Sequence, residues 1–154
     1  MKFILDTNTL LLFIVGMASK NYISDFKPTY KFSIADFDLL LMLLEDAEAV
    51  VTIPQVIAET SNHLSKGFKS ARIRQHVWAE FQKFIQKTDE LYRESIVGSQ
   101  DRAFVRLGIT DAILAILSKD VYLVVTCDTP LFQEILGRGY AAINFNHEIG
   151  RQIF

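Results

Sequence analysis

Short apolar runs alternate with helical stretches along the chain, and this alternation constrains the fold more than any other feature of the sequence. Four runs have the length and the apolar, often β-branched character of buried strands, at residues 2–5, 49–53, 121–126 and 141–145. Strands of continuous apolar character that alternate with helices are typical of a parallel sheet that is covered on both faces. The sequence therefore predicts an α/β fold with a doubly wound, parallel sheet.

The segments between these runs contain helix signals. Ser33 and Asp36 match a capping box, in which each side chain covers a backbone N–H group of the other residue. Pro54 suits the first turn of a helix, where its missing N–H group costs nothing. Gly16 and Gly108 are expected to end helices, and Thr110 is expected to cap the helix that follows. We expect helices at residues 9–15, 33–44, from 54 onward, 68–87, 99–107, 110–117 and from 130 to 138, with a loop at residues 17–32.

Length, composition and charge limit the possible functions. The 154 residues are typical of one domain, so residues 1–154 are expected to form a single domain. Half of the residues are hydrophobic, which excludes a disordered chain. The 16 Lys and Arg residues against 18 Asp and Glu residues give a net charge of −2. This balance excludes a uniformly basic nucleic-acid coat, so any nucleic-acid surface has to be local.

The sequence also bears on the compartment. A single cysteine, Cys127, permits no internal disulfide and favours a reducing compartment. The longest apolar run, residues 10–18, is far shorter than the roughly 20 residues that cross a bilayer. Lys2 before that run leaves a secretory signal as an alternative, but Asp6 interrupts it and residues 3–5 are more typical of a strand. We therefore expect a cytoplasmic protein with no membrane partner.

Acidic residues lie where parallel sheets bind ligands, at or just beyond the carboxyl ends of the predicted strands. Asp6 and Asp128 directly follow strands, at the same edge of the sheet. Glu59 lies in the helix that begins at Pro54, about one and a half turns from its start. Asp111 lies in the first turn of another helix, an end that tolerates an anion. Local arguments place the first three near one edge, and Asp111 joins them only if its helix packs suitably.

Such a set of acids has a recognisable chemistry. Converging carboxylates repel one another unless they are protonated or bridged by a cation. Oxygen ligands without clustered His or Cys indicate Mg²⁺ or Mn²⁺ rather than zinc. These ions activate water and neutralise charge on a phosphoryl oxygen, as in phosphodiester hydrolysis. Each acid also has a simpler interpretation: a helix cap at Asp128, a dipole partner at Asp111, a solvent-facing residue at Glu59 and a turn residue at Asp6.

Four short motifs, in order along the chain, resemble those of PIN-domain proteins. They are Phe3-Ile4-Leu5-Asp6-Thr7-Asn8, Ile53-Pro54-Gln55-Val56-Ile57-Ala58-Glu59, Leu107-Gly108-Ile109-Thr110-Asp111-Ala112 and Val125-Thr126-Cys127-Asp128. This family of metal-dependent ribonucleases includes the toxin subunits of bacterial and archaeal toxin–antitoxin pairs. The resemblance covers nearly the whole chain, although the stretch between residues 67 and 97 follows none of the family's motifs.

The resemblance implies a three-layer α/β/α fold with a parallel sheet of about five strands. It assigns the binding of Mg²⁺ or Mn²⁺ and the positioning of the attacking water to four acids: Asp6, Glu59, Asp111 and Asp128. Asn8 corresponds to the usual polar neighbour of the first acid, and Thr126 to a hydroxyl that often supports the site. The implied function is a metal-dependent endoribonuclease that acts on RNA. The resemblance also implies a role as the toxin of a toxin–antitoxin pair, with an antitoxin protein as partner.

Basic residues gather after the helix that contains Glu59. The best candidate path for RNA consists of four of them: Lys66, Lys69, Arg72 and Arg74. Lysine and arginine neutralise phosphates, and the nearby aromatic residues Trp78 and Phe81 are of the kind that stacks on bases. The simpler interpretation is a solvated helix face whose aromatic residues lie in the core, and we prefer it.

Other functions remain as alternatives. A PIN-like module that binds RNA or protein without cutting is one, although the presence of all four acids argues against it. An aspartyl-phosphate protein is disfavoured, because Asn8 stands where dehalogenase-like phosphatases have a second Asp and no late Lys follows a strand as in receiver domains. The apolar residues 10–15 and 39–44 suit a homodimer face or a groove for an antitoxin helix, and equally suit simple core packing.

Overall fold

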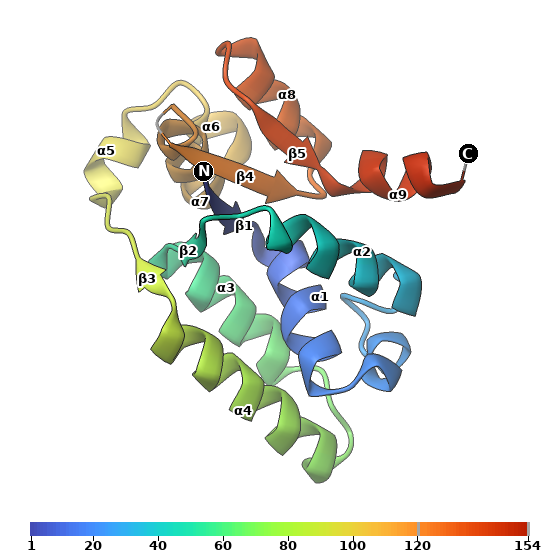
Figure 1. Cartoon of the computed structure of the whole chain (residues 1–154). Coiled ribbons are helices and arrows are strands. Elements are labelled where there is room, and N and C mark those ends of the chain that lie inside the picture. Colours follow the sequence, from blue (N-terminus) through green and yellow to red (C-terminus); the bar gives the residue numbers. More distant parts are fainter. Residues whose placement is uncertain (120, 154) are drawn as a thin grey trace.

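One parallel sheet of five strands lies at the centre of the computed structural model, which describes residues 1–119 and 121–153 (Figure 1). The strands are β1 (Lys2–Leu5), β2 (Ala49–Thr52), β3 (Asp89–Glu90), β4 (Tyr122–Thr126) and β5 (Ala142–Asn144). Their order across the sheet is β3-β2-β1-β4-β5, and every neighbouring pair is parallel. The predicted α/β fold with a doubly wound sheet is confirmed.

Helices cover both faces of the sheet, as Figure 1 shows. On one side lie α1 (Thr7–Ala18), the 3₁₀ helix η1 (Lys20–Asp25), α2 (Ile34–Glu45), α3 (Pro54–Ser65) and α4 (Ala71–Lys87). On the other side lie α5 (Ser95–Ser99), α6 (Phe104–Leu107), α7 (Ile109–Leu117) and α8 (Thr129–Gly137), and α9 (Phe145–Ile153) continues from the end of β5. Connections between parallel strands are right-handed. The connections from β1 to β3 run across the sheet in one direction, and those from β3 to β5 run in the other. The two sets of connecting helices therefore lie on opposite faces. The result is a three-layer α/β/α arrangement.

Helix α1 supplies much of the core. Its residues Leu10, Leu11, Leu12, Ile14 and Val15 are at most 1% exposed. The simpler of the two interpretations therefore holds for these five residues, since their side chains pack inside the chain's own core. Within residues 1–119 and 121–153, no helix is long and apolar enough to cross a membrane.

Gly16 lies inside α1 and does not end it, so the predicted helix at residues 9–15 was too short. The ring of Phe37, from α2, packs directly on this glycine, where a Cβ atom would collide with it. Gly16 therefore permits a close approach of two helices. The predicted loop at residues 17–32 was also wrong in part, because α1 extends to Ala18 and η1 follows.

The predicted helix at residues 99–107 was wrong in its first half, because α5 ends at Ser99 and α6 begins only at Phe104; its predicted end before Gly108 is confirmed. The side chain of Asp101 accepts a hydrogen bond from the Ala103 N–H group (2.9 Å), which stabilises a turn in place of a helix. The helix predicted from residue 68 begins at Ala71 instead. Before it, the ring of Phe68 stacks on Phe26, with 4.6 Å between the ring centroids.

The strand predicted at residues 141–145 ends at Asn144, because Phe145 begins α9, a helix that was not predicted. Strand β3 was not predicted either, since its two residues are acidic and contain no apolar signal. The strand predicted at residues 49–53 ends at Thr52. The strand predicted at residues 121–126 begins one residue later, at Tyr122. The helix predicted to end at residue 138 ends one residue earlier, at Gly137.

Arg138, at the end of α8, joins this helix to the turn between α5 and α6. Its guanidinium group donates to Asp101 through Nη1 and Nη2 and to Glu134 through Nε. The three side chains are 13%, 13% and 9% exposed, respectively. Hydrogen bonds from Arg138 hold the pKa of Asp101 below its ordinary value. Arg102 and Arg106 also bind Glu134, at 2.8 and 2.6 Å.

We expect the substitution Arg138→Met to lower the free energy of unfolding by about 1–3 kcal/mol, because Asp101 and Glu134 would lose a partner while remaining mostly buried. Urea denaturation monitored by circular dichroism measures this change. Arg151→Met is the matched control, because its side chain is 76% exposed where it pairs with Glu148. The control should change stability by less than about 0.5 kcal/mol. Equally small effects of both substitutions would contradict the prediction.

Candidate active site

The topological switch point of the sheet lies between β1 and β4, because the helices that follow these neighbouring strands lie on opposite faces (Figure 1). In open α/β sheets, ligands bind in the crevice at this point. Asp6 directly follows β1, and its N–H group continues the strand pairing by donating to the Val125 carbonyl oxygen (2.9 Å). Asp128 follows β4 after one intervening residue. Both acids therefore lie at the switch point.

Asp6 is buried, with 8% of its surface exposed. The Thr7 N–H group donates to its Oδ1 atom, and the Thr126 hydroxyl donates to its Oδ2 atom, each at 2.7 Å. Burial, with smaller contributions from the charges of Glu59 and Asp128, raises the pKa of Asp6 to about 6 in spite of these two hydrogen bonds. A negative charge at Asp6 is therefore unfavourable without a nearby cation.

Thr126 connects the turns that contain two of the acids. Its buried hydroxyl donates to Asp6 and accepts from the Asp128 N–H group (2.9 Å). Asp128 is the N-cap of α8, and its Oδ1 atom accepts from the Leu131 N–H group (2.9 Å). The interpretation of Asp128 as a helix cap is therefore correct. Its second carboxylate oxygen is not needed for the cap and leaves room for another role.

Glu59, in the second turn of α3, is half-buried and accepts one hydrogen bond on each carboxylate oxygen. Thr7, the first residue of α1, donates to Oε2 at 2.6 Å, and Thr110, from the first turn of α7, donates to Oε1 at 2.5 Å. The interpretation of Glu59 as a solvent-facing helix residue is therefore wrong. Its side chain connects helices from both faces of the sheet.

Asp111 lies in the first turn of α7 and is half-buried. Burial, together with the charges of Asp6, Asp128 and Glu59, raises its pKa to about 7. The hydrogen bond from Thr110 to Glu59 also brings the first turn of α7, which contains Asp111, beside α3. The charges of the other three acids act on Asp111, and those of Glu59 and Asp128 act on Asp6.

The donor set of this acidic cluster, Asp6, Glu59, Asp111 and Asp128, consists of carboxylate oxygens, which Mg²⁺ and Mn²⁺ prefer. In the part of the chain that the structure describes, no three His, Cys, Asp or Glu side chains are grouped closely enough to hold a metal ion as they stand. Hydroxyl and N–H groups instead occupy one or both oxygens of Asp6, Glu59 and Asp128. The chemistry of the residues therefore fits a divalent cation, and some of the carboxylates would have to approach one another to surround one.

The predicted helix cap at Thr110 was wrong. The N-cap position of α7 is occupied by Gly108, whose φ of +88° favours glycine. Sequence reasoning also missed Thr7 as a member of the site. The available signal was adjacency, because Thr7 directly follows Asp6 and Thr110 directly precedes Asp111.

Among the described residues, the side chains of two further members of the predicted motifs, Asn8 and Cys127, form no hydrogen bond with the acidic cluster. Asn8 is exposed in the first turn of α1. Cys127, between Thr126 and Asp128, is half-buried, and burial raises the pKa of its thiol to about 12. A thiol with so high a pKa is not a nucleophile at neutral pH.

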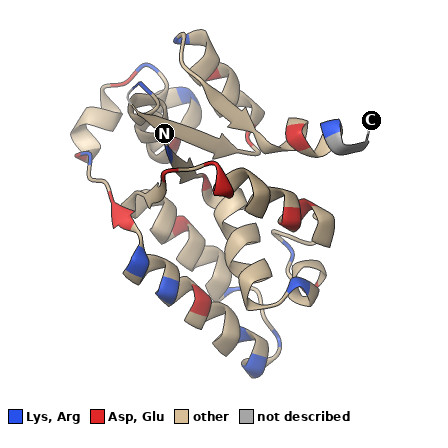
Figure 2. Cartoon of the chain, viewed as in Figure 1, with Lys and Arg blue, Asp and Glu red and all other residues tan. Residues whose placement is uncertain are grey.

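The four basic residues of the predicted RNA path are exposed where α3 ends and α4 begins (Figure 2). Lys66 is the C-cap of α3, seven residues or about 10 Å along the helix from Glu59. Arg74 donates to the Ser65 carbonyl oxygen (3.2 Å) and lies 5.7 Å from the centroid of the Trp78 ring. Phe81 is buried, so the preferred interpretation, with aromatic residues packed inward, holds for this residue.

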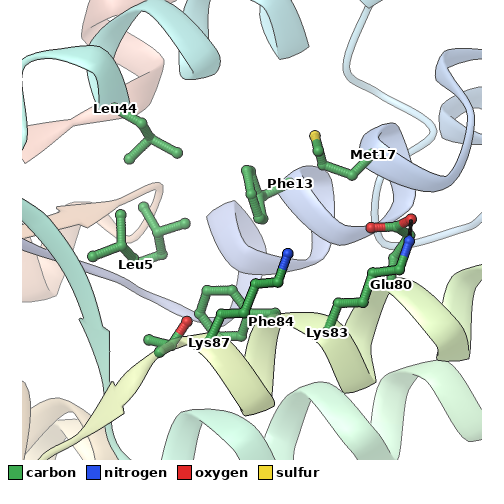
Figure 3. Close-up of a pocket in the computed structure, with 10 residues that line it drawn as sticks. Leu5, Phe13, Met17, Leu44, Glu80, Lys83, Phe84 and Lys87 are labelled. Atoms are coloured by element: carbon green, nitrogen blue, oxygen red, sulfur yellow. Dashed lines mark hydrogen bonds and ion pairs between the residues drawn. The ribbon is translucent and has the colours of Figure 1, made fainter.

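An apolar pocket of about 370 Å³ lies between α1, α2, α4 and the sheet (Figure 3). Ten residues line it: Leu5, Phe13, Met17, Leu44, Val50, Glu80, Lys83, Phe84, Lys87 and Thr88. None of the four acids is among them. The pocket, which we call the α1–α4 groove, is therefore distinct from the acidic cluster.

No protein-family model matches this chain, and no curated protein sequence shows significant similarity to it.

Proposed function

We propose that this protein is an Mg²⁺- or Mn²⁺-dependent endoribonuclease of the PIN type. The observation that supports the proposal is the acidic cluster at the switch point, in which burial and mutual repulsion raise the pKa of Asp6 to about 6 and that of Asp111 to about 7. Repelling carboxylates at a ligand-binding crevice favour a cation. The resemblance of the four short motifs to those of PIN domains points to the same activity.

In this proposal the four acids have different roles in the metal site. Buried Asp6 anchors the site, because two hydrogen bonds fix both of its oxygens. Glu59 and Asp128 are likewise oriented by hydrogen bonds, whereas Asp111 is half-buried and can be reached by water from the crevice. When bound, a divalent cation lowers the pKa of water and neutralises charge on a phosphoryl oxygen. The carboxylates then orient the attacking water toward the phosphodiester bond.

RNA would approach along the exposed side chains of Lys66, Lys69, Arg72 and Arg74. Such contacts neutralise phosphates without reading the sequence of the bases. A role as a toxin would add an antitoxin protein as partner. Its helix would fit the α1–α4 groove, where an apolar floor is bordered by Lys83 and Lys87 (Figure 3). A homodimer is a further possible use of the same apolar side chains, and the single cysteine is in keeping with a cytoplasmic location.

The alternative is a catalytically silent PIN-like module that binds RNA or protein. The observation that favours it is the lack, among the described residues, of three side chains already grouped to hold a metal ion.

Cleavage of an end-labelled RNA in the presence of Mn²⁺, Mg²⁺ or EDTA distinguishes the two functions. We expect internal cleavage with Mn²⁺ and none with EDTA. Glu59→Gln should abolish it, because the amide replaces one oxygen ligand. Asp38→Asn is the matched control, since Asp38 pairs with Lys20 on the surface of α2 and should retain full activity. Cleavage that persists in EDTA would overturn the metal-dependent function, and Mn²⁺ binding without cleavage would support the silent module.

A further inference from the structure

Two threonine hydroxyls hold the carboxylate of Glu59. The Thr7 hydroxyl donates to Oε2 at 2.6 Å and the Thr110 hydroxyl to Oε1 at 2.5 Å. Both threonines are only 7% exposed. Among the described residues, no lysine, arginine or histidine forms an ion pair with Glu59. The orientation of this carboxylate therefore depends on the two hydroxyls.

The positions of the threonines connect this bridge to two other acids. Thr7 follows Asp6 in the first turn of α1, and Thr110 precedes Asp111 in the first turn of α7. These helices lie on opposite faces of the sheet (Figure 1). The bridge of Thr7, Glu59 and Thr110 therefore ties together the two turns that contain Asp6 and Asp111, against the repulsion between their charges.

We propose that Thr7 and Thr110 are positioning residues that hold Glu59 ready to bind a divalent cation between Asp6 and Asp111. The inference rests on the proposed function for the nature of the ligand. An ionised carboxylate has about four lone-pair sites, and the two hydroxyls use one on each oxygen. Each oxygen thus keeps a site for the cation while its orientation is maintained.

The size of the expected effect follows from the behaviour of metal ligands in general. Removing a group that hydrogen-bonds a ligating side chain typically weakens metal affinity 10- to 100-fold. Valine has nearly the shape of threonine but no hydroxyl, whereas serine keeps the hydroxyl. A purely structural role would change stability and leave the intrinsic affinity for the metal unaltered.

The test is a titration of the full chain with Mn²⁺ at 20 °C, in which electron paramagnetic resonance measures the free ion. We expect Thr7→Val and Thr110→Val each to raise the dissociation constant by about 10- to 100-fold. Thr7→Ser and Thr110→Ser should stay within about threefold of the wild type. Thr60→Val is the matched control, because Thr60 is the buried neighbour of Glu59 in α3 and its hydroxyl has no partner among the described residues. This variant should bind as the wild type does.

The outcomes separate this inference from the proposed function. Unchanged Mn²⁺ affinity in a folded valine variant would overturn the positioning role while leaving the ribonuclease proposal intact. If the wild-type protein binds Mn²⁺ but does not cleave RNA, the ribonuclease proposal is overturned. The positioning role would still be supported by weaker Mn²⁺ binding of the valine variants. A wild-type protein that does not bind Mn²⁺ would overturn both. Circular dichroism establishes folding, and if one valine variant does not fold, the other decides the test.

Discussion

Replacement of Asp6 by asparagine is expected to abolish Mn²⁺-dependent RNA cleavage and to stabilise the metal-free protein at pH 8. The pKa of Asp6 is about 6 in the folded protein against an ordinary value of 3.8, so ionisation at pH 8 costs the fold about 3 kcal/mol. Asparagine avoids this cost and still accepts from the Thr7 N–H group. Because the Thr126 hydroxyl loses its acceptor, we expect a net gain of about 1–2 kcal/mol. The melting temperature in EDTA should then rise by about 2–8 °C.

The main effect of Asp6→Asn should be on catalysis. Removing a hydrogen-bond partner of a metal ligand costs about 10- to 100-fold, so removing a ligand should lower kcat/KM by more than about 100-fold. Initial rates on a labelled RNA and melting curves in EDTA measure the two effects. Asp38→Asn on the surface of α2 serves as the control for both measurements. Retained cleavage, or a less stable metal-free protein, would contradict the assignment of Asp6.

Raising the pH from 5 to 8 without metal is expected to lower the stability contributed by the acidic cluster. The pKa values of Asp6 and Asp111, about 6 and about 7, lie above the ordinary value of 3.8. Between about pH 4 and 7, the folded protein therefore binds more protons than the unfolded chain, and the free energy of unfolding falls as the pH rises. Saturating Mn²⁺ should reverse this loss at pH 8, because a ligand at 100 times its dissociation constant adds about 2.7 kcal/mol. The melting temperature should rise by about 5–10 °C.

Asp111→Asn tests the same electrostatics. With one acid removed, the decrease in melting temperature between pH 5 and 8 should become smaller, and the rise with Mn²⁺ should fall below about 2 °C. Differential scanning calorimetry at several pH values, with EDTA or Mn²⁺, measures both. If the variant keeps the pH dependence and the Mn²⁺ response of the wild type, Asp111 neither is repelled by the other carboxylates nor contributes to Mn²⁺ binding.

Much of the fold could be predicted because its signals are local. The apolar runs that form β1, β2, β4 and β5 have few polar residues, and the capping box of Ser33 and Asp36 begins α2 as expected, with both of its hydrogen bonds present. Strand β3 and helices α5 and α6 could not be predicted in this way. Strand β3 depends on pairing with Val51 and Thr52, and the turn before α6 depends on the contact of Asp101 with Arg138. Such contacts between distant segments leave no periodic pattern in the sequence.

The candidate site shows the same limit. The acids at strand ends could be located from the rule for parallel sheets. Of their partners, only Thr126 was anticipated, from the resemblance, and its hydroxyl does donate to Asp6. Thr7 and Thr110 have no distinguishing local pattern, and Thr110 has the spacing of a helix cap. Their importance for Glu59 follows only from the packing of α1, α3 and α7 around one carboxylate. The basic residues after α3 were found by composition alone, and composition does not determine the surface that they share.

The strand order has a consequence for the time at which the protein becomes able to act. Strands β1 and β4 are neighbours in the sheet, and the hydrogen bond between Thr126 and Asp6 joins residues 120 positions apart. Contacts of such long range form late in folding. During synthesis, Asp6 and Glu59 leave the ribosome long before Asp128, so a chain interrupted before β4 lacks both the partner strand and one of the four acids. In the proposed ribonuclease, unfinished chains would therefore lack the complete site while they are still on the ribosome.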